Sequence, residues 1–151
     1  MASLSIDDLT GMTGSEIGTS RWFVVGQDRI HAFADATEDH QFIHVDPAAA
    51  AMTPFGGTIA HGFLSLSLLS AMAYDAIPKV DGVKMMVNYG FDRVRFLAPV
   101  RSGSKVRGRF VLAAFDERAP GQYLARYTVT VEIDGSDKPA LTADWLGLTF
   151  I

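Results

Sequence analysis

The sequence predicts an α+β fold in which a curved antiparallel β-sheet encloses one long, apolar helix. Three observations support this prediction. The first half of the chain contains helical and loop patterns, whereas the second half contains four long β-rich stretches. Residues 59–77 are apolar around most of a helical circumference, as in a helix buried in a protein core. With 151 residues, the chain is expected to form a single domain, residues 1–151, around one hydrophobic core.

Four short elements are expected before the long helix. They are a helix that follows Ser5 and ends by Gly11 or Gly14, a strand at 21–25, a helix at 27–37 and a helix at 47–51. Ser5 and Asp46 are of residue types that cap helix N-termini, and Pro47 suits a first helical position. Residues 27–37 repeat apolar side chains at helical spacing, so this helix is expected to be amphipathic and to lead into a loop at 39–44.

Thr58 is placed to cap the long helix, and Pro78 is placed to end it. The strands expected to surround this helix span 83–99, 105–116, 122–133 and 140–151. Turn-forming residues separate these strands. In the third strand, Tyr127, Val129 and Val131 share one face and polar residues alternate with them. A long buried helix held by an antiparallel meander is the hot-dog arrangement.

Asp39 and His44 are the main candidates for chemistry. They lie five residues apart in the loop that follows residues 27–37. A carboxylate and an imidazole at this spacing can hold one water molecule between them and move its proton. The alternative for either residue alone is a structural role, as a loop salt bridge or a local turn. We favour catalysis because the pair precedes a helix whose N-terminus offers unpaired N–H groups to an oxygen gaining negative charge.

Three further candidates belong to the long helix. His61 either contacts the substrate directly or has a structural role, with its ring bonded to a loop carbonyl, and the structural role is favoured. Gly62 lacks a side chain, so a substrate carbonyl can approach its N–H closely; the alternative is a glycine that merely weakens the helix. Ser70 lies about two turns further along and either borders the site or bonds to its own helix.

Composition and charge argue against several other classes of protein. The net charge of −4 and the pI of about 5.4 disfavour generic nucleic-acid binding. The chain has no cysteine, so disulfides, thiolate nucleophiles and cysteine metal sites are excluded. Residues 1–10 lack the apolar run of a signal peptide, and His61 and Asp75 disfavour a membrane span at 59–77. We therefore expect a cytoplasmic protein that does not bind to membranes.

A metal centre is an alternative use of the same side chains. The potential ligands are Asp39, His40, His44, Asp46 and His61. His40 and His44 are four residues apart, but the segment between them is not clearly helical and no HExxH-type pattern frames them. The sequence therefore does not favour a metal site.

The segments 39–47, 58–62 and 94–104 together resemble the MaoC-like dehydratases, a family that includes the R-specific enoyl-CoA hydratases. Segments 41–47 and 58–62 are most similar to its nodulation-protein-N-like branch. The hydratase motif of the family commonly reads Asp-x-Asn-Pro-aliphatic-His. Asp39 and His44 match its two catalytic positions, but Gln41 replaces the Asn, Phe42 replaces the Pro, and Glu38 lies where a glycine is usual.

The resemblance implies reversible addition of water to a trans-2-enoyl-CoA, giving an R-3-hydroxyacyl-CoA. It implies that the Gly62 N–H receives the thioester oxygen, that Ser70 lies near the site, and that the protein is a homodimer or higher homo-oligomer with the acyl chain near the interface. No cofactor is expected, because the thioester itself acidifies C2 and polarises C3. Basic residues that border the site would contact the coenzyme A phosphates, and the candidates are Arg93, Arg95, Arg101, Lys105 and Arg107.

Two rival functions remain open from the sequence. A thioesterase of the same fold would direct water at the carbonyl carbon instead of C3, and it needs the same carboxylate and oxyanion donor. A non-catalytic acyl-CoA-binding module would keep the pocket without turnover, although the presence of both Asp39 and His44 argues against it.

Overall fold

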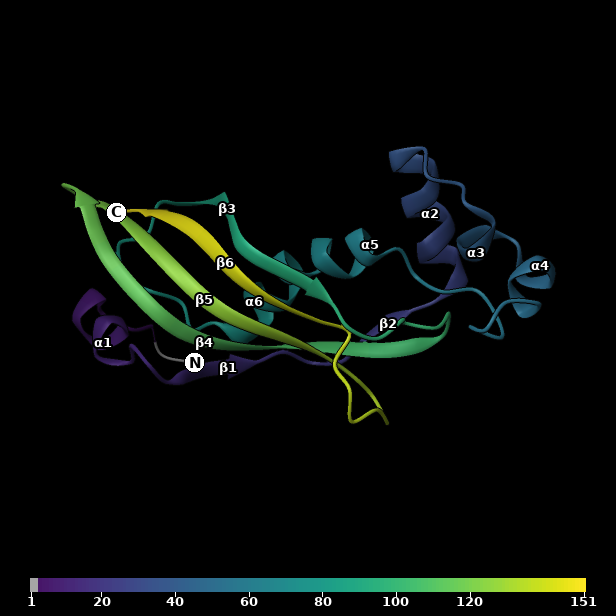
Figure 1. Ribbon diagram of the computed structural model, residues 1–151. Coiled ribbons are helices and arrows are strands. Elements are labelled where there is room, and N and C mark those ends of the chain that lie inside the picture. Colours follow the sequence, from purple (N-terminus) through teal and green to yellow (C-terminus); the bar gives the residue numbers. More distant parts are fainter. Residues whose placement is uncertain (1–2) are drawn as a thin grey trace.

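One antiparallel sheet dominates the computed structural model, which describes residues 3–151 (Figure 1). The strands are β1 (Glu16–Thr19), β2 (Phe23–Val25), β3 (Met85–Phe96), β4 (Ser104–Ala119), β5 (Gln122–Ile133) and β6 (Leu141–Phe150). Their order in the sheet is β1-β4-β5-β6-β3, and β2 pairs with the other end of β4. The curved sheet and the helices beside it form the α+β hot-dog fold that the sequence predicts.

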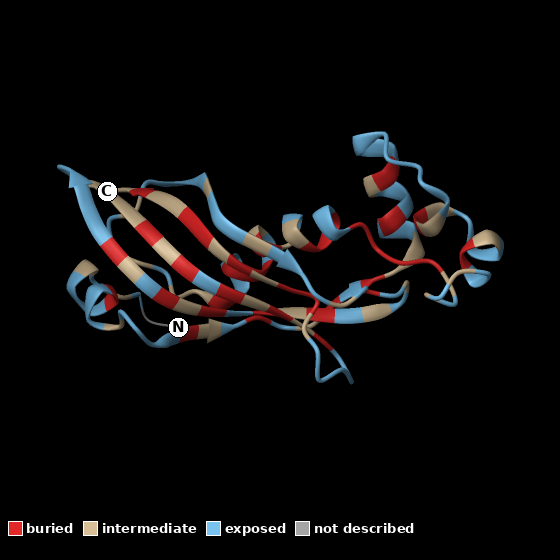
Figure 2. Cartoon of the chain, viewed as in Figure 1, coloured by how far each residue is buried: buried red, intermediate tan, exposed pale blue. Residues whose placement is uncertain are grey.

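Strands β4, β5 and β6 form a meander, with a tight turn between β4 and β5 at Gly121, whose φ is 72°. Along β5 the buried residues alternate with more exposed ones, as Figure 2 shows, so that Tyr127, Val129 and Val131 face the core as predicted. The expectation of a four-strand meander is wrong. β3 pairs with β6 along its whole length, because β4 is already paired with β5 on one side and with β1 and β2 on the other.

The helices are α1 (Ile6–Gly11), α2 (Gln27–Thr37), α3 (Phe42–Val45), α4 (Pro47–Ala51), α5 (Gly62–Ser67) and α6 (Leu69–Ala76). The caps expected at Ser5 and Asp46 are present, since each side chain accepts a hydrogen bond from a backbone N–H of the following helix. Helices α2, α3 and α4 lie together beyond one end of the sheet, whereas α6 packs against it (Figure 1). None of the helices in residues 3–151 combines the length and apolar character that crossing a membrane requires.

The helix expected over residues 59–77 differs from the observed one in its start, its cap and its continuity. It begins only at Gly62, because the N–H groups of Ile59 and Ala60 donate to the Ile43 and Val100 carbonyls in an extended segment. Thr58 does not cap it, since the Thr58 hydroxyl donates to Gln27 Oε1 instead. The helix is also interrupted at Leu68, where α5 ends and α6 begins.

Helices α5 and α6 are buried on one face only, which corrects the expectation of burial on nearly every side. Leu64, Leu69 and Met72 are buried against the sheet. On the other side of the helices, Phe63 is 66% exposed and Tyr74 is 84% exposed. β3 is also exposed along most of its length, and in the described chain its second edge has no strand partner. The apolar surface over α5, α6 and β3 is therefore uncovered in a single chain.

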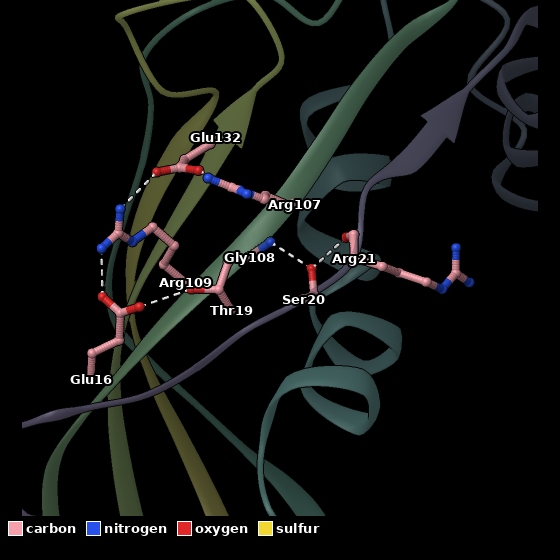
Figure 3. A network of polar contacts seen from close by, with 8 residues as sticks. All are labelled: Glu16, Thr19, Ser20, Arg21, Arg107, Gly108, Arg109 and Glu132. Carbon is pink, nitrogen blue, oxygen red and sulfur yellow. Dashed lines mark hydrogen bonds and ion pairs between the residues drawn. The ribbon is translucent and has the colours of Figure 1, made fainter.

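The solvent-facing side of β1, β4 and β5 carries a network of ion pairs (Figure 3). Arg109 bonds both Glu16 and Glu132, at 2.6 and 3.2 Å, and Arg107 bonds Glu132 at 2.6 Å. Hydrogen bonds from Arg109 and Thr19 lower the pKa of Glu16. Desolvation acts to raise the pKa of Glu132, but hydrogen bonds from the two arginines outweigh it, so this pKa is also lowered. The network joins three strands across the sheet. One of them, β1, was not predicted from the sequence.

Candidate active site

Asp39 lies in the sharp bend that follows α2. Glu38 has a φ of 62°, which is the left-handed conformation that favours glycine, and it turns the chain directly before Asp39. The backbone N–H of Gln41 donates to Asp39 Oδ1 at 3.3 Å. His40 turns away from this carboxylate and bonds Asp35 at 2.9 Å. The Asp39 side chain is consequently exposed and held near the start of α3.

His44 is placed by α3, which is a single helical turn, and only 7% of the residue is exposed. Its Nδ1 lies 2.7 Å from the Ile59 carbonyl oxygen. A carbonyl oxygen can only accept a hydrogen bond, so Nδ1 carries the hydrogen in the neutral ring. Nε2 then holds the free lone pair, which is the arrangement a general base needs.

His61 packs directly on His44, with ring centroids 3.8 Å apart and the rings nearly parallel, at 24°. Its Nε2 lies 3.0 Å from the backbone carbonyl of Asp39. This is the loop-carbonyl bond that the structural interpretation of His61 expects. The residue is 3% exposed, and its Nδ1 is buried without a hydrogen-bond partner in residues 3–151.

The structure therefore brings together three residues that are up to 22 positions apart in the chain. One carboxylate oxygen of Asp39 and one ring nitrogen each of His44 and His61 lie within 4.8 Å of one another. The stacked rings do not suit a shared metal ion. A ligated metal lies in the plane of the imidazole about 2 Å from its nitrogen, and it cannot lie in two nearly parallel planes that are separated as these are. Asp46 is also occupied, since it caps α4.

Gly62 begins α5 directly after His61. In residues 3–151, the N–H groups of Gly62 and Phe63 donate to no acceptor, as expected for a helix N-terminus. Gly62 lines a cavity of about 340 Å³ between α5 and the segment that follows β3. A Cβ on Gly62 would lie 3.0 Å from the Phe96 ring, so no other residue type fits there without displacing this ring.

Ser65 is a candidate that the sequence reasoning missed. It lines the same cavity as Gly62 and is 3% exposed, and its hydroxyl makes no hydrogen bond within residues 3–151. The signal available in the sequence was its position, because a residue three positions after Gly62 lies on the same side of a helix.

Ser70 lies on α6 and lines a different cavity, of about 380 Å³, between α6, β3 and β6. The walls of this cavity are mostly apolar and include Ala73, Tyr127 and Trp145. Burial raises the pKa of Tyr127 to about 12, so its hydroxyl stays neutral at physiological pH. The structure thus separates Ser70 from the cavity beside Gly62 by about two helical turns.

The basic residues proposed to contact coenzyme A phosphates differ in whether they already form ion pairs or hydrogen bonds within the protein. Arg107 and Arg93 pair with Glu132 and Asp144 on the sheet. Arg101 donates to the Phe55 carbonyl, at the rim of the cavity beside Gly62. Arg95 bonds only the Val94 carbonyl in the described chain, and Lys105 makes no ion pair there.

The chain is similar to one protein family, to several curated proteins and to solved structures. Residues 8–133 match the family model of the MaoC like domain. The chain is 54% identical over 149 residues to nodulation protein N of Rhizobium meliloti, covering 98% of this chain and 92% of that protein. It is 46% identical over 140 residues to 3-hydroxyacyl-thioester dehydratase Z of Mycobacterium tuberculosis, covering 93% and 92%. The solved structure of the (R)-hydratase from A. caviae has a TM-score of 0.72 and 29% identity, covering 89% of this chain and 96% of that one.

Proposed function

Because the chain belongs to the MaoC-like domain family, we propose that it adds water reversibly to a trans-2-enoyl-CoA and forms an R-3-hydroxyacyl-CoA. Relatives include a 3-hydroxyacyl-thioester dehydratase and an (R)-hydratase, in agreement with the resemblance that the sequence shows. The observation that carries the proposal is the placement of Asp39 and His44. An exposed carboxylate lies beside an imidazole whose free lone pair is fixed by the bond to Ile59.

In the proposed reaction, Asp39 and His44 hold the attacking water between them. His44 Nε2 accepts a proton from this water while the water oxygen forms a bond to C3. The π electrons of the C2–C3 double bond move toward the thioester, whose oxygen gains negative charge. A proton is then returned to C2, which restores the thioester carbonyl. Dehydration is the same sequence in reverse.

The thioester oxygen is proposed to bind at the Gly62 N–H. This group has no acceptor among the described residues, and the glycine leaves room for a carbonyl to approach. The acyl chain is proposed to extend toward the apolar cavity that Ser70 lines. Three basic candidates, Arg95, Arg101 and Lys105, form no ion pair with a described carboxylate. Arg101 bonds Phe55 at the rim of the cavity beside Gly62 and Arg95 directly precedes Phe96 in its wall, so we propose these two for the coenzyme A phosphates.

The active form is proposed to be a homodimer. Within residues 3–151, β3 has an unpaired edge, and its apolar side chains are exposed together with Phe63 and Tyr74 of the neighbouring helices. The exposed residues of β3 include Met85, Met86, Val87, Tyr89 and Phe91. Pairing two β3 edges would cover this surface and would continue the sheet from one copy into the next.

Hydration of crotonyl-CoA tests the function directly. The purified protein should remove the ultraviolet absorbance of the conjugated thioester, and the product should be the R-3-hydroxyacyl-CoA on chiral analysis. Release of free thiol instead would support a thioesterase. Saturable binding of enoyl-CoA without turnover would support a binding module, and both of these results would contradict the proposal.

A further inference from the structure

Nδ1 of His61 is a buried side-chain nitrogen that lacks a hydrogen-bond partner within residues 3–151. Leaving a buried acceptor unpaired normally costs stability. An apolar ring of similar size would fill this position without that cost. A histidine at this position is therefore explained by contacts that an apolar ring cannot make.

Those contacts converge on the two residues proposed for catalysis. His61 Nε2 donates to the backbone carbonyl of Asp39 at 3.0 Å, and within the described chain this is the only hydrogen bond that the carbonyl accepts. The ring also lies against His44, with the centroids 3.8 Å apart, and Phe33 packs 4.9 Å from it. One side chain thus contacts the backbone of one catalytic candidate and the ring of the other.

The loop around Asp39 has few other restraints. The Asp39 side chain is exposed, the residue before it has a left-handed backbone, and the Gln41 N–H contact to Oδ1 is long, at 3.3 Å. His44 is held separately, by its bond to Ile59 and by its place in α3. Without the bond from His61, the carboxylate would be free to move relative to the imidazole.

We propose that His61 is a positioning residue, which fixes Asp39 relative to His44 by holding the Asp39 carbonyl with Nε2–H while its ring packs on His44. This inference rests on the proposed function, because it assigns a task to His61 within the same site. It differs from direct contact with the substrate, which the sequence left open as an alternative role for His61. Neither ring nitrogen is free to meet a ligand, since Nε2 is bonded and Nδ1 is enclosed.

Two variants separate positioning from packing. His61→Phe keeps a ring of similar size against His44 but cannot donate to Asp39, and His61→Gln keeps a donor but loses the ring. We expect His61→Phe to lower kcat for crotonyl-CoA by about a hundredfold, the scale of a misplaced catalytic group, with KM within about threefold of wild type. The kcat of His61→Gln should be at least about tenfold higher than that of His61→Phe. The control is His40→Gln, since His40 neighbours Asp39 but bonds Asp35, and its kcat should not change.

An NMR measurement on the unliganded protein keeps the test independent of activity. In ¹⁵N spectra of the imidazoles, His61 should carry its hydrogen on Nε2. His61→Phe should shift the backbone carbonyl ¹³C resonance of Asp39, which loses the hydrogen bond from His61, and His61→Gln should bring it back toward the wild-type value. A His61 that carries its hydrogen on Nδ1, or a folded His61→Phe with wild-type kcat, would overturn the inference. If His61→Phe does not fold, the position of the hydrogen on the His61 ring of the wild-type protein still decides the question, because that measurement needs no variant. Failure of the wild-type protein to hydrate any enoyl-CoA would reject the proposed function alone, because the NMR result does not depend on turnover.

Discussion

The hydrogen bond from His44 Nδ1 to the Ile59 carbonyl determines which ring nitrogen can act as a base. If Asp39 and His44 handle the same water through this nitrogen, Asp39→Asn and His44→Ala should each lower kcat by at least about a hundredfold. The double variant should be little slower than either single one, because the two groups act as a unit. Steady-state kinetics with crotonyl-CoA measures this, with Asp35→Asn as the control carboxylate on α2. Additive losses in the double variant would show that the two residues act independently.

Glu38 allows a second test at a single position. Its φ of 62° costs a residue with a Cβ roughly 1–2 kcal/mol, whereas glycine adopts this conformation freely but loses more entropy on folding. Glu38→Gly is therefore expected to raise the free energy of unfolding by about 0.5–1 kcal/mol. Urea denaturation measures this change. Glu38→Ala, which keeps the Cβ, should show no gain, and equal stabilisation by both variants would mean that the side chain and not the backbone is responsible.

Gly62 is the first residue of helix α5, and replacing it tests the proposed contact with the thioester oxygen. Gly62→Val should lower kcat about a hundred- to thousandfold, the usual loss when one oxyanion donor is removed, by blocking the approach of the thioester. The structure adds a control that the sequence did not indicate, because the new side chain would also press on Phe96. In Gly62→Val combined with Phe96→Ala, kcat should stay low. Recovery of kcat in this double variant would show that displacement of Phe96, and not a blocked N–H, caused the loss.

The ion pairs across β1, β4 and β5 predict a pH dependence of stability. Glu16 and Glu132 have lowered pKa values in the folded protein, so their contribution is present above the unfolded value near 4.5 and is lost as the pH falls through the folded values. Arg109→Gln removes the ion pairs that Arg109 makes with Glu16 and Glu132. Its deficit in urea midpoint relative to wild type should therefore be largest near neutral pH and should shrink below about pH 4. A deficit that is constant from pH 7 to pH 3 would contradict this explanation. Because these groups are largely solvated, the whole effect should be small.

Most elements could be predicted from the sequence because their signals are local. The helix at Gln27–Thr37 and the cap at Asp46 depend on neighbouring residues, and both are present as expected. The start of α5 could not be predicted in the same way. Thr58 is a good N-cap residue, but Gln27, which is 31 positions away, takes its hydroxyl. The pairing of β3 with β6 likewise depends on which strands are already occupied, which no local pattern contains.

The residues of the site show the same difference between local signals and contacts made by distant residues. The spacing of Asp39 and His44 identified them as a pair, and the structure places them within 4.8 Å together with His61. The stacking of His44 on His61 and the bond from His61 to the Asp39 carbonyl join segments 15 or more residues apart, so the sequence could suggest a carbonyl partner without naming it. Ser65 was missed for another reason, since it is one of three serines in the apolar stretch 59–77 and only its position relative to Gly62 distinguishes it from the others.

For the whole molecule, the proposal of a dimer predicts a mass near twice 16.3 kDa, or a multiple of it, by light scattering at micromolar concentration. Replacing Met85 and Tyr89 by lysine should shift this mass toward the monomer, because it places charges on the uncovered strand β3. The control is Val24→Lys, which changes an equally exposed apolar residue on β2 and should leave the mass unchanged. A wild-type monomer with full activity would reject the dimer.

The pairing of β3 with β6 also has a consequence during synthesis on the ribosome. The 44 residues from Leu97 to Ala140 must be added after β3 is complete before the first residue of its partner β6 appears. At about 5–20 residues per second, this interval lasts roughly 2–9 s. Throughout it, the apolar side chains of β3 have neither β6 nor a second copy beside them. The growing chain is therefore most vulnerable to aggregation, and most dependent on chaperones, in the interval just before its last strand emerges.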